Sequence, residues 1–250
     1  MSWKLIALDL DGTLLNMNGQ VSVLNREWLA RVQLEGIIVT LVTGRHVSKV
    51  MSIAKDLAIN TPFVTSNGCE IWTTEGKLIQ RTCLSLEQVS WIHEWAMKNH
   101  LTYRTYRIDN VHDWYPEKGV DQIGNDWLKV LISSKESCCL SDLYKEVQDS
   151  NLFEVVGYNI EVTNSITAID LHPRGVSKLT ALQKLCNQLR IEQDEVIAFG
   201  DDSNDIEMLR WSGLGVAMKN ASPIIHAVAD RIAPHHNSDG VAEVLRELLS

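Results

Sequence analysis

The sequence lacks paired cysteines and long apolar runs, and each absence excludes a class of protein. Its five cysteines are scattered and none belongs to a Cys-x-x-Cys pair, so we expect reduced thiols and neither a disulfide framework nor a zinc site. No stretch approaches the roughly 18–20 consecutive apolar residues of a membrane helix. A carboxylate at Asp9 also comes before any signal-peptide core could form. We therefore expect a cytoplasmic protein with no membrane partner.

Basic residues are in short supply as well: 23 Lys and Arg stand against 32 Asp and Glu, a formal net charge of -9. Binding to a nucleic-acid backbone needs a basic field, so we expect no nucleic-acid partner. A small anionic ligand is compatible with this balance, because a metal ion or a few placed donors reverse the local sign of the potential.

What remains is the composition of a folded protein, with 45% hydrophobic and 22% charged residues and no internal repeat. Short apolar runs alternate with helical patterns at both ends of the chain, an order typical of a parallel α/β sheet. Asn67-Gly68 between two short runs predicts a hairpin. The expected strands at the two ends are 4–10, 37–42, 63–66, 70–73, 196–199 and 213–217, and the expected helices are 23–35, 46–58, 178–189, 205–211, 223–229 and 241–249.

The pattern changes after about residue 80, where strands follow one another in pairs and helices become fewer. This favours an α+β insertion. We predict one α/β domain formed by residues 1–80 and 176–250, interrupted by a smaller domain at 81–175. In that insertion the expected helices are 86–99 and 141–149, and the expected strands are 101–108, 128–133, 153–158, 160–163 and 168–172.

Two acidic motifs follow predicted strands. The first runs from Asp9 to Thr13 and reads Asp-Leu-Asp-Gly-Thr. If the strand continues, Asp9 and Asp11 project to one side at its carboxyl end, where open α/β sheets bind ligands. Two such carboxylates repel each other unless they share a cation or a proton. The alternative is an ordinary acidic turn.

The second motif, Gly200 to Asp205, reads Gly-Asp-Asp-Ser-Asn-Asp directly after an apolar run. Three acids within five residues suit Mg²⁺, which prefers hard oxygen ligands. The alternative is a helix N-terminus, where acids complement the dipole and Ser203 serves as the cap.

Two further features favour an anion. Thr43-Gly44-Arg45 follows a predicted strand and precedes a helix, so it forms either an anion site or a simple cap. Lys178 lies in the first turn of a helix, where a cation opposes the dipole, so it either faces a phosphate or is a surface lysine. Together the four motifs supply the groups that phosphoryl transfer requires: carboxylates, a metal site, a hydroxyl and an ammonium.

The order of these four motifs resembles the haloacid dehalogenase (HAD) superfamily of phosphohydrolases, and within it the Cof-type subfamily IIB. The resemblance covers essentially the whole chain and extends to Ser66-Asn67-Gly68, Met218-Lys219-Asn220-Ala221 and Asp239-Gly240-Val241-Ala242. It implies a Rossmann-like parallel-sheet core with an α+β (C2B-type) cap domain inserted between the second and third motifs.

The resemblance also implies roles for individual residues. Asp9 is the nucleophile that forms an aspartyl-phosphate, and Asp11 is the acid that protonates the leaving group and then the base that activates water. Mg²⁺ is bound by Asp9, the backbone carbonyl of Asp11, and Asp201. The implied phosphate-binding residues are the amide of Leu10, Thr43, Gly44, Lys178 and Asn204, and the supporting residues are Arg45, Asn67 and Asp205.

The expected function is therefore Mg²⁺-dependent hydrolysis of a small phosphorylated metabolite. Sugar phosphates, nucleotide- or flavin-precursor phosphates and pyridoxal phosphate all qualify. Two alternatives use the same fold: a phosphomutase that returns the phosphoryl group to its substrate, and a catalytically idle regulatory protein that binds a metabolite.

Overall fold

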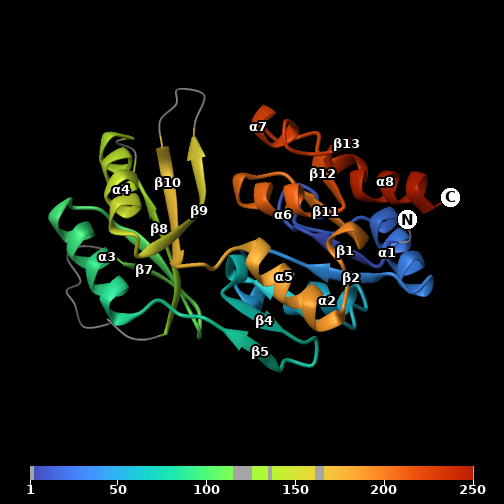
Figure 1. Ribbon diagram of the computed structural model, residues 1–250, viewed down its shortest axis with the longest axis horizontal. Helices are drawn as coiled ribbons and strands as arrows, with labels where there is room; N and C mark the ends of the chain where they lie inside the picture. Colours follow the sequence, from blue (N-terminus) through green and yellow to red (C-terminus); the bar gives the residue numbers. More distant parts are fainter. Residues whose placement is uncertain (1–2, 115–125, 135–136, 161–165, 250) are drawn as a thin grey trace. The chain divides into compact units, whose positions relative to one another are not determined.

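The computed structural model describes residues 3–114, 126–134, 137–160 and 166–249 (Figure 1). The chain divides into two compact units. The first unit, called the core unit here, contains Met1–Ile79 and Lys178–Ser250. The second, called the cap unit, contains Gln80–Ser177.

A five-stranded parallel sheet forms the centre of the core unit, in the order β13-β12-β11-β1-β2. Because all five strands run the same way, their carboxyl ends meet at one edge, and the loops at that edge are brought together from distant parts of the sequence. The strands are β1 (Leu5–Leu8), β2 (Ile38–Leu41), β11 (Val196–Gly200), β12 (Leu214–Met218) and β13 (Arg231–Ala233).

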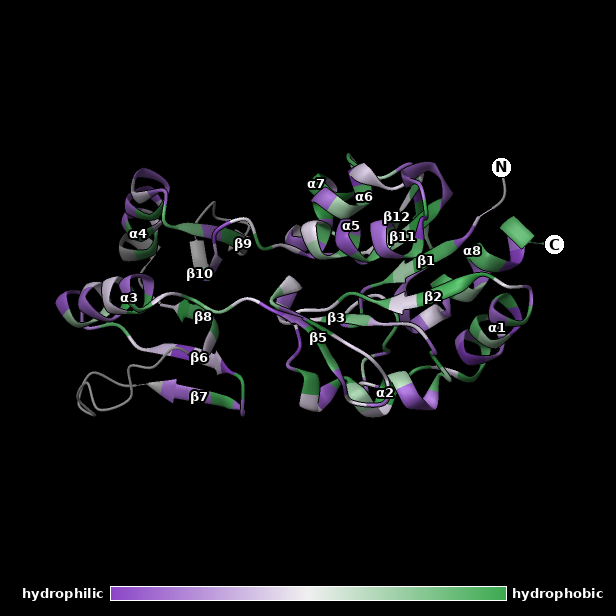
Figure 2. Ribbon diagram, turned by 60° about the horizontal axis from the view of Figure 1, so that its bottom comes forward, coloured by the Kyte–Doolittle hydropathy of each residue, from purple (hydrophilic) through white to green (hydrophobic). Residues whose placement is uncertain are grey.

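Helices cover both faces of this sheet because its central strands are apolar on both sides. In β1, Ile6 and Leu8 belong to one hydrophobic cluster while Leu5 and Ala7 belong to the other, and the apolar colouring of β1 is visible in Figure 2. The first face packs against α1 (Val23–Leu34), α2 (Met51–Asp56) and α8 (Gly240–Leu249). The second face packs against α5 (Lys178–Leu189), α6 (Ile206–Trp211) and α7 (Pro223–His226).

The helix expected at 46–58 is shorter than predicted. It consists of a 3-10 turn, Val47–Lys49, followed by α2. The His46 ring accepts a hydrogen bond from the Ser48 amide, which caps this tight turn, and Ala58 takes a left-handed conformation (φ 51°) just beyond the helix. Similar 3-10 turns occur at Ser66–Gly68, Gln193–Glu195, Ser203–Asp205 and His236–Ser238.

The predicted hairpin at 63–73 is confirmed, but its first strand is not part of the parallel sheet as expected. β3 (Phe63–Thr65) pairs with β4 (Glu70–Trp72) in an antiparallel sheet that continues to β5 (Leu78–Arg81). Its β-sheet pairing with the parallel sheet is limited to an isolated bridge between Val42 and Val64, beyond the end of β2, among the described residues. The antiparallel partner β4 offers the longer register, so the hairpin forms its own small sheet.

The cap unit is an antiparallel sheet of five strands, in the order β7-β6-β8-β10-β9. The two helices α3 (Leu86–Lys98) and α4 (Ser137–Ser150) share one hydrophobic cluster with alternate residues of β8 and β10, so they cover the same face. The predicted α+β class of the insertion is confirmed. Its strands are β6 (Tyr103–Arg107), β7 (Val111–Trp114), β8 (Trp127–Ser133), β9 (Phe153–Ile160) and β10 (Ile166–Pro173).

Three strands were not predicted from the sequence, because their residues show little regular pattern of apolar side chains. β7 reads Val-His-Asp-Trp, and β13 reads Arg-Ile-Ala at the edge of the parallel sheet. β5 has only one apolar pair before Gln80 and Arg81. Of the piece predicted at 160–163, Ile160 belongs to β9 and the remainder lies outside the described residues.

We predict that Phe199→Ala destabilises the protein by about 3–5 kcal/mol, because a fully buried aromatic side chain in β11 is replaced by a cavity. The matched control is Leu34→Ala at the end of α1, where the side chain is 89% exposed. That change should stay within about 0.5 kcal/mol of the unsubstituted protein. Urea unfolding measures both values, and equal midpoints for the two variants would contradict the assignment of β11 to the core.

Candidate active site

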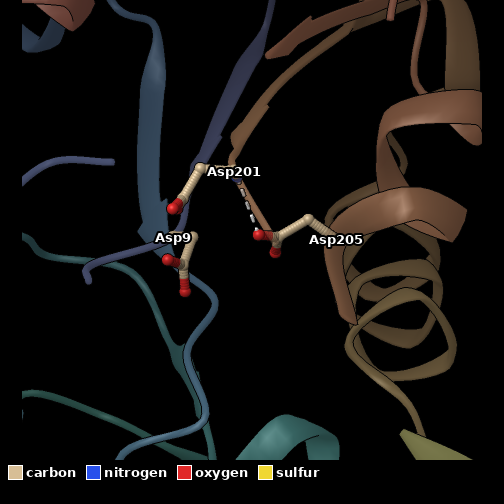
Figure 3. Close-up of side chains that lie close together, drawn as sticks. All are labelled: Asp9, Asp201 and Asp205. Atoms are coloured by element: carbon tan, nitrogen blue, oxygen red, sulfur yellow. Dashed lines mark hydrogen bonds between the residues drawn. The ribbon is translucent and has the colours of Figure 1, made fainter. Parts of the chain in front are cut away.

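Three acidic side chains meet at the carboxyl edge of the parallel sheet. Asp9 follows β1, and Asp201 follows β11, the strand paired with it. The Asp9 amide continues the pairing by donating to the Phe199 carbonyl at 3.1 Å. Asp205 comes from the 3-10 turn after β11. One carboxylate oxygen from each of these acids lies within 4.8 Å of the others (Figure 3).

Lys178, the first residue of α5, connects two of these acids. Its Nζ donates to Asp9 Oδ1 at 2.6 Å and to Asp205 Oδ1 at 2.7 Å. The Lys178 side chain is 1% exposed and that of Asp9 7%, so the alternative of a surface lysine is wrong. The unfavourable position of this cation in a first helical turn is offset by two buried carboxylates.

Asp205 uses both carboxylate oxygens inside the protein. While Oδ1 accepts from Lys178, Oδ2 accepts from the backbone amides of Asp201 and Asp202 at 3.0 and 3.1 Å. A Cβ on Gly200 would lie 2.4 Å from Asp205 Cβ, so only glycine fits there. The expected cap also exists, but Asp202 rather than Ser203 supplies it, by accepting from the Ser203 amide. Through its three hydrogen bonds, Asp205 holds the Lys178 side chain and the backbone of Asp201 and Asp202 in place.

Asp201 is held by two residues to which sequence analysis gave no role. Thr13 Oγ1 donates to Asp201 Oδ1 at 2.7 Å, and Asn220 Nδ2 donates to Asp201 Oδ2 at 3.3 Å. Thr13 belongs to the first acidic motif, and Asn220 follows β12 just as Asp201 follows β11. Asn220 could have been predicted from the sequence, because it follows a strand of the same sheet, as Asp201 does.

The first acidic motif is arranged differently from the expectation. β1 ends at Leu8, so Asp9 and Asp11 lie beyond it, and strand alternation does not apply to them. Asp9 is buried, whereas Asp11 is exposed and makes a two-pronged ion pair with Arg45, with Nε donating to Oδ2 at 2.7 Å. The side chain of Leu10 between them is fully buried in the core.

The Thr43-Gly44-Arg45 segment is fastened to the hairpin turn. The Thr43 amide donates to Val64 O, and the Asn67 amide donates to Thr43 O, at 3.1 and 3.0 Å. Gly44 leaves space for Asn67, since a Cβ there would lie 2.8 Å from Asn67 Oδ1. Asn67 itself takes a left-handed conformation (φ 53°). The simple-cap alternative is wrong for this segment, because His46 caps the 3-10 turn that follows; Thr43 Oγ1 accepts from the Arg45 amide instead.

Asn204 joins this segment to the acidic cluster. Its Nδ2 donates to Asn67 Oδ1 at 3.1 Å across 137 residues of sequence. The structure thus brings Asp9, Asp201, Asp205 and Lys178 together, and it links Asn204 to Asn67 and Arg45 to Asp11.

One ammonium does not neutralise this site. Burial raises the pKa of Asp9 well above its usual value, although the nearby Lys178 opposes the shift. Burial likewise raises the pKa of Asp201 to about 7, against the Thr13 hydrogen bond. Burial disfavours the charged form of Lys178, but Asp205 and Asp9 outweigh it, so the pKa of Lys178 lies above its usual value. A further positive charge close to these carboxylates would therefore favour their ionised forms.

The arrangement fits a divalent cation. Asp9 and Asp201 offer hard carboxylate oxygens that each accept at most one hydrogen bond in the described structure, whereas Asp205 accepts three in all, from Lys178 and two amides. Burial raises the pKa values of Asp9 and Asp201, and a cation bound to both would favour their charged forms.

A Rossmann-like core with an inserted α+β unit and clustered carboxylates at the carboxyl edge of its sheet is the framework of an α/β hydrolytic enzyme. Residues 6–245 match the model of the haloacid dehalogenase-like hydrolase family, and the chain belongs to this family. The predicted family, fold class and phosphatase activity are confirmed, which sets aside the alternative of an idle regulatory protein.

Several relatives support this membership. The chain is 31% identical over 244 residues to the 5-amino-6-(5-phospho-D-ribitylamino)uracil phosphatase YcsE of Bacillus subtilis, covering 97% of this chain and 94% of that protein. It is 29% identical over 286 residues to Phosphatase YwpJ of the same organism, covering 98% and 100%. A solved haloacid dehalogenase-like hydrolase from B. subtilis has a TM-score of 0.85 at 28% identity and covers 98% of this chain and 100% of that one.

No helix in the described part of the chain has both the length and the apolar character needed to cross a membrane.

We predict that the free energy of unfolding of the metal-free protein falls as the pH rises from about 4 through 7. Burial raises the pKa of Asp201 to about 7, whereas an unfolded Asp titrates near ~3.9. Between these values the folded state binds more protons than the unfolded state, so stability decreases with rising pH. Asp9, whose pKa is also raised, adds a slope of the same sign.

Urea unfolding in EDTA across this pH range measures the slope. Asp201→Asn should make it shallower, and Asp142→Asn, at an exposed position on α4, should leave it unchanged. An equal slope for Asp201→Asn and the unsubstituted protein would show that Asp201 is not the group involved.

Proposed function

We propose that this phosphatase is a Mg²⁺-dependent phosphomonoesterase that forms an aspartyl-phosphate on Asp9. The observation that carries the proposal is the Asp9 side chain, 7% exposed and held at 2.6 Å by Lys178 beside two further acids. A buried carboxylate held in one orientation is suited to attack a phosphorus atom, because little of its geometry has to be rearranged during the reaction.

We assign metal binding to the carboxylates of Asp9 and Asp201 and to the backbone carbonyl of Asp11. Asp205 supports them by holding Lys178 and the amides of Asp201 and Asp202. When bound, Mg²⁺ supplies positive charge that offsets the phosphate dianion and favours the ionised form of Asp9.

Besides the cation, hydrogen-bond donors of the protein itself are needed to bind the phosphoryl oxygens of the substrate. We assign this role to the Lys178 ammonium, the Thr43 hydroxyl, and the amides of Gly44 and Leu10. Asn204 Nδ2 uses one N–H on Asn67 and has a second to offer. Asn67 acts indirectly, by fastening both Asn204 and the Thr43 segment.

The reaction runs in two balanced steps. An Asp9 oxygen attacks phosphorus, the bond from phosphorus to the leaving oxygen breaks, and Asp11 donates its proton to that oxygen. Asp11 then takes a proton from water, whose oxygen attacks phosphorus and releases inorganic phosphate from Asp9. The exposed position of Asp11 suits a group that exchanges protons with water, and Arg45 binds both of its carboxylate oxygens. This ion pair favours the charged carboxylate, so acting as the acid requires Asp11 to separate from Arg45 and take up a proton first.

For the substrate we propose a small phosphorylated metabolite, selected by the inserted domain at 81–175. The relative that is 31% identical over nearly the full chain is named for 5-amino-6-(5-phospho-D-ribitylamino)uracil. This favours a flavin-precursor phosphate as the first substrate to test, ahead of sugar phosphates and pyridoxal phosphate.

A screen of phosphorylated metabolites, read out as inorganic phosphate, tests the function. We predict release that stops in excess EDTA and returns with Mg²⁺, and that is at background in Asp9→Asn. The matched control is Asp202→Asn, an exposed neighbour of the metal ligand where Asn still caps the turn; it should keep near-normal activity.

Two outcomes would overturn this function. Full turnover in EDTA would show that the reaction does not require a metal ion. Isomerised product without phosphate release would identify the phosphomutase.

The role of Asp11 predicts a dependence on the leaving group. Asp11→Asn keeps the nucleophile and the backbone carbonyl but removes the proton donor. A sugar alkoxide needs that proton to leave, whereas nitrophenolate needs it much less, and general acid catalysis is worth roughly 10²–10⁴-fold for a poor leaving group. Burst kinetics should therefore show a much larger loss in phosphorylation rate for alkyl than for aryl phosphates. Equal losses would mean that Asp11 is not the acid.

A further inference from the structure

Asn220 lies in the turn that follows β12 and has three hydrogen-bonding partners from three different loops. Its Nδ2 donates to the Gly12 carbonyl at 2.8 Å and to Asp201 Oδ2 at 3.3 Å. Its Oδ1 accepts from the His236 amide at 3.1 Å. One amide side chain thereby joins loops that are 208, 19 and 16 residues away in the sequence.

These loops follow neighbouring strands. Gly12 follows β1, Asp201 follows β11, Asn220 follows β12 and His236 follows β13, and the sheet order is β13-β12-β11-β1. Asn220 thus connects the carboxyl ends of four adjacent strands. His236 strengthens the connection, since its Nδ1 donates to the Leu15 carbonyl at 2.7 Å.

The Asp201 carboxylate is fixed from both sides in this arrangement. Asn220 holds Oδ2, and the buried Thr13 holds Oδ1 at 2.7 Å. Gly12 approaches so closely that a Cβ there would lie 2.0 Å from Asp201 Oδ2, and its φ of +77° is the left-handed region that favours glycine. Each carboxylate oxygen still has a lone pair to offer, because it accepts one hydrogen bond here.

We infer that Asn220 is a positioning residue, which sets the orientation of Asp201 for a divalent cation and holds the Gly12 loop against it. This inference rests on the metal site of the proposed function. An amide is suited to the task because it donates to a carboxylate and to a carbonyl while accepting from a third group, and it adds no charge. Replacing a residue that orients a ligating carboxylate typically costs roughly 10–100-fold in metal affinity or activity.

The experiment is a titration of the protein with Mn²⁺ alone, without substrate, followed by electron paramagnetic resonance or calorimetry. Asn220→Ala removes all three hydrogen bonds, and it should weaken metal binding by roughly 10–100-fold. The milder Asn220→Ser, whose side chain is too short to span the three partners, should weaken it in the same direction. It decides the matter if Asn220→Ala does not fold.

The chain offers a matched control in Asn237. Its Oδ1 accepts from the Met17 amide at 2.8 Å, so it also fastens the loop after β1 to the turn after β13, but it has no hydrogen bond to Asp201. Asn237→Ala should bind Mn²⁺ within about twofold of the unsubstituted protein. Thermal unfolding in EDTA measures the structural cost of each variant separately from its metal affinity.

Each outcome has one meaning. Weak binding in the Asn220 variants together with normal binding in Asn237→Ala supports the inference. Unchanged affinity in the Asn220 variants, or an equal loss in Asn237→Ala, overturns it and leaves the proposed function in place. If the unsubstituted protein does not bind the cation, the proposed function falls, and the inference falls with it.

Discussion

The buried ammonium of Lys178 is the interaction on which the rest of the site depends. It lies between Asp9 and Asp205, which are 169 and 27 residues away in the sequence, and all three side chains are almost completely buried. Removing an ion from water costs several kcal/mol in a folded protein, so none of the three charges is favourable there without the others. The carboxyl ends of β1 and β11 and the start of α5 must therefore meet for this cluster to form.

That cluster is arranged for chemistry more than for stability. The carboxylates of Asp9, Asp201 and Asp205 lie close to Lys178. Despite this ammonium, burial raises the pKa values of Asp9 and Asp201 above those of an ordinary Asp. Replacing buried ion pairs by apolar residues is often neutral or stabilising, so stability alone does not account for such a group. The proposed function accounts for this excess of acid, because a cation and a phosphate group would offset it.

Close backbone approach makes this density of polar groups possible. Gly12 and Gly200 bring their loops against Asp201 and Asp205 at distances where no Cβ fits, and Gly44 does the same for Asn67. Side chains then join the loops: Thr13 and Asn220 hold Asp201, while Asn204 holds Asn67. The sheet supplies the common edge, and these contacts set the distances along it.

Local pattern in the sequence was enough for the fold class and for most elements. Apolar runs such as Ile37–Val42 and the stripe of α5 record which faces are buried, and this depends only on neighbouring residues. The motifs also indicated which loops to expect at the carboxyl edge of the sheet, since each follows a strand or begins a helix. The short strands β7 and β13 were missed because polar residues at a sheet edge leave no such record.

What only the tertiary structure decided is which of these loops meet and how. In the folded protein Lys178 is buried between two acids, and Asp9 is buried while Asp11 is exposed. β3 belongs to a separate sheet with β4 and β5. Thr13 and Asn220 are also paired with Asp201. These outcomes depend on strand order and on where each strand ends. Both follow from packing between segments up to about two hundred residues apart, and periodicity within a single segment carries no information about such partners.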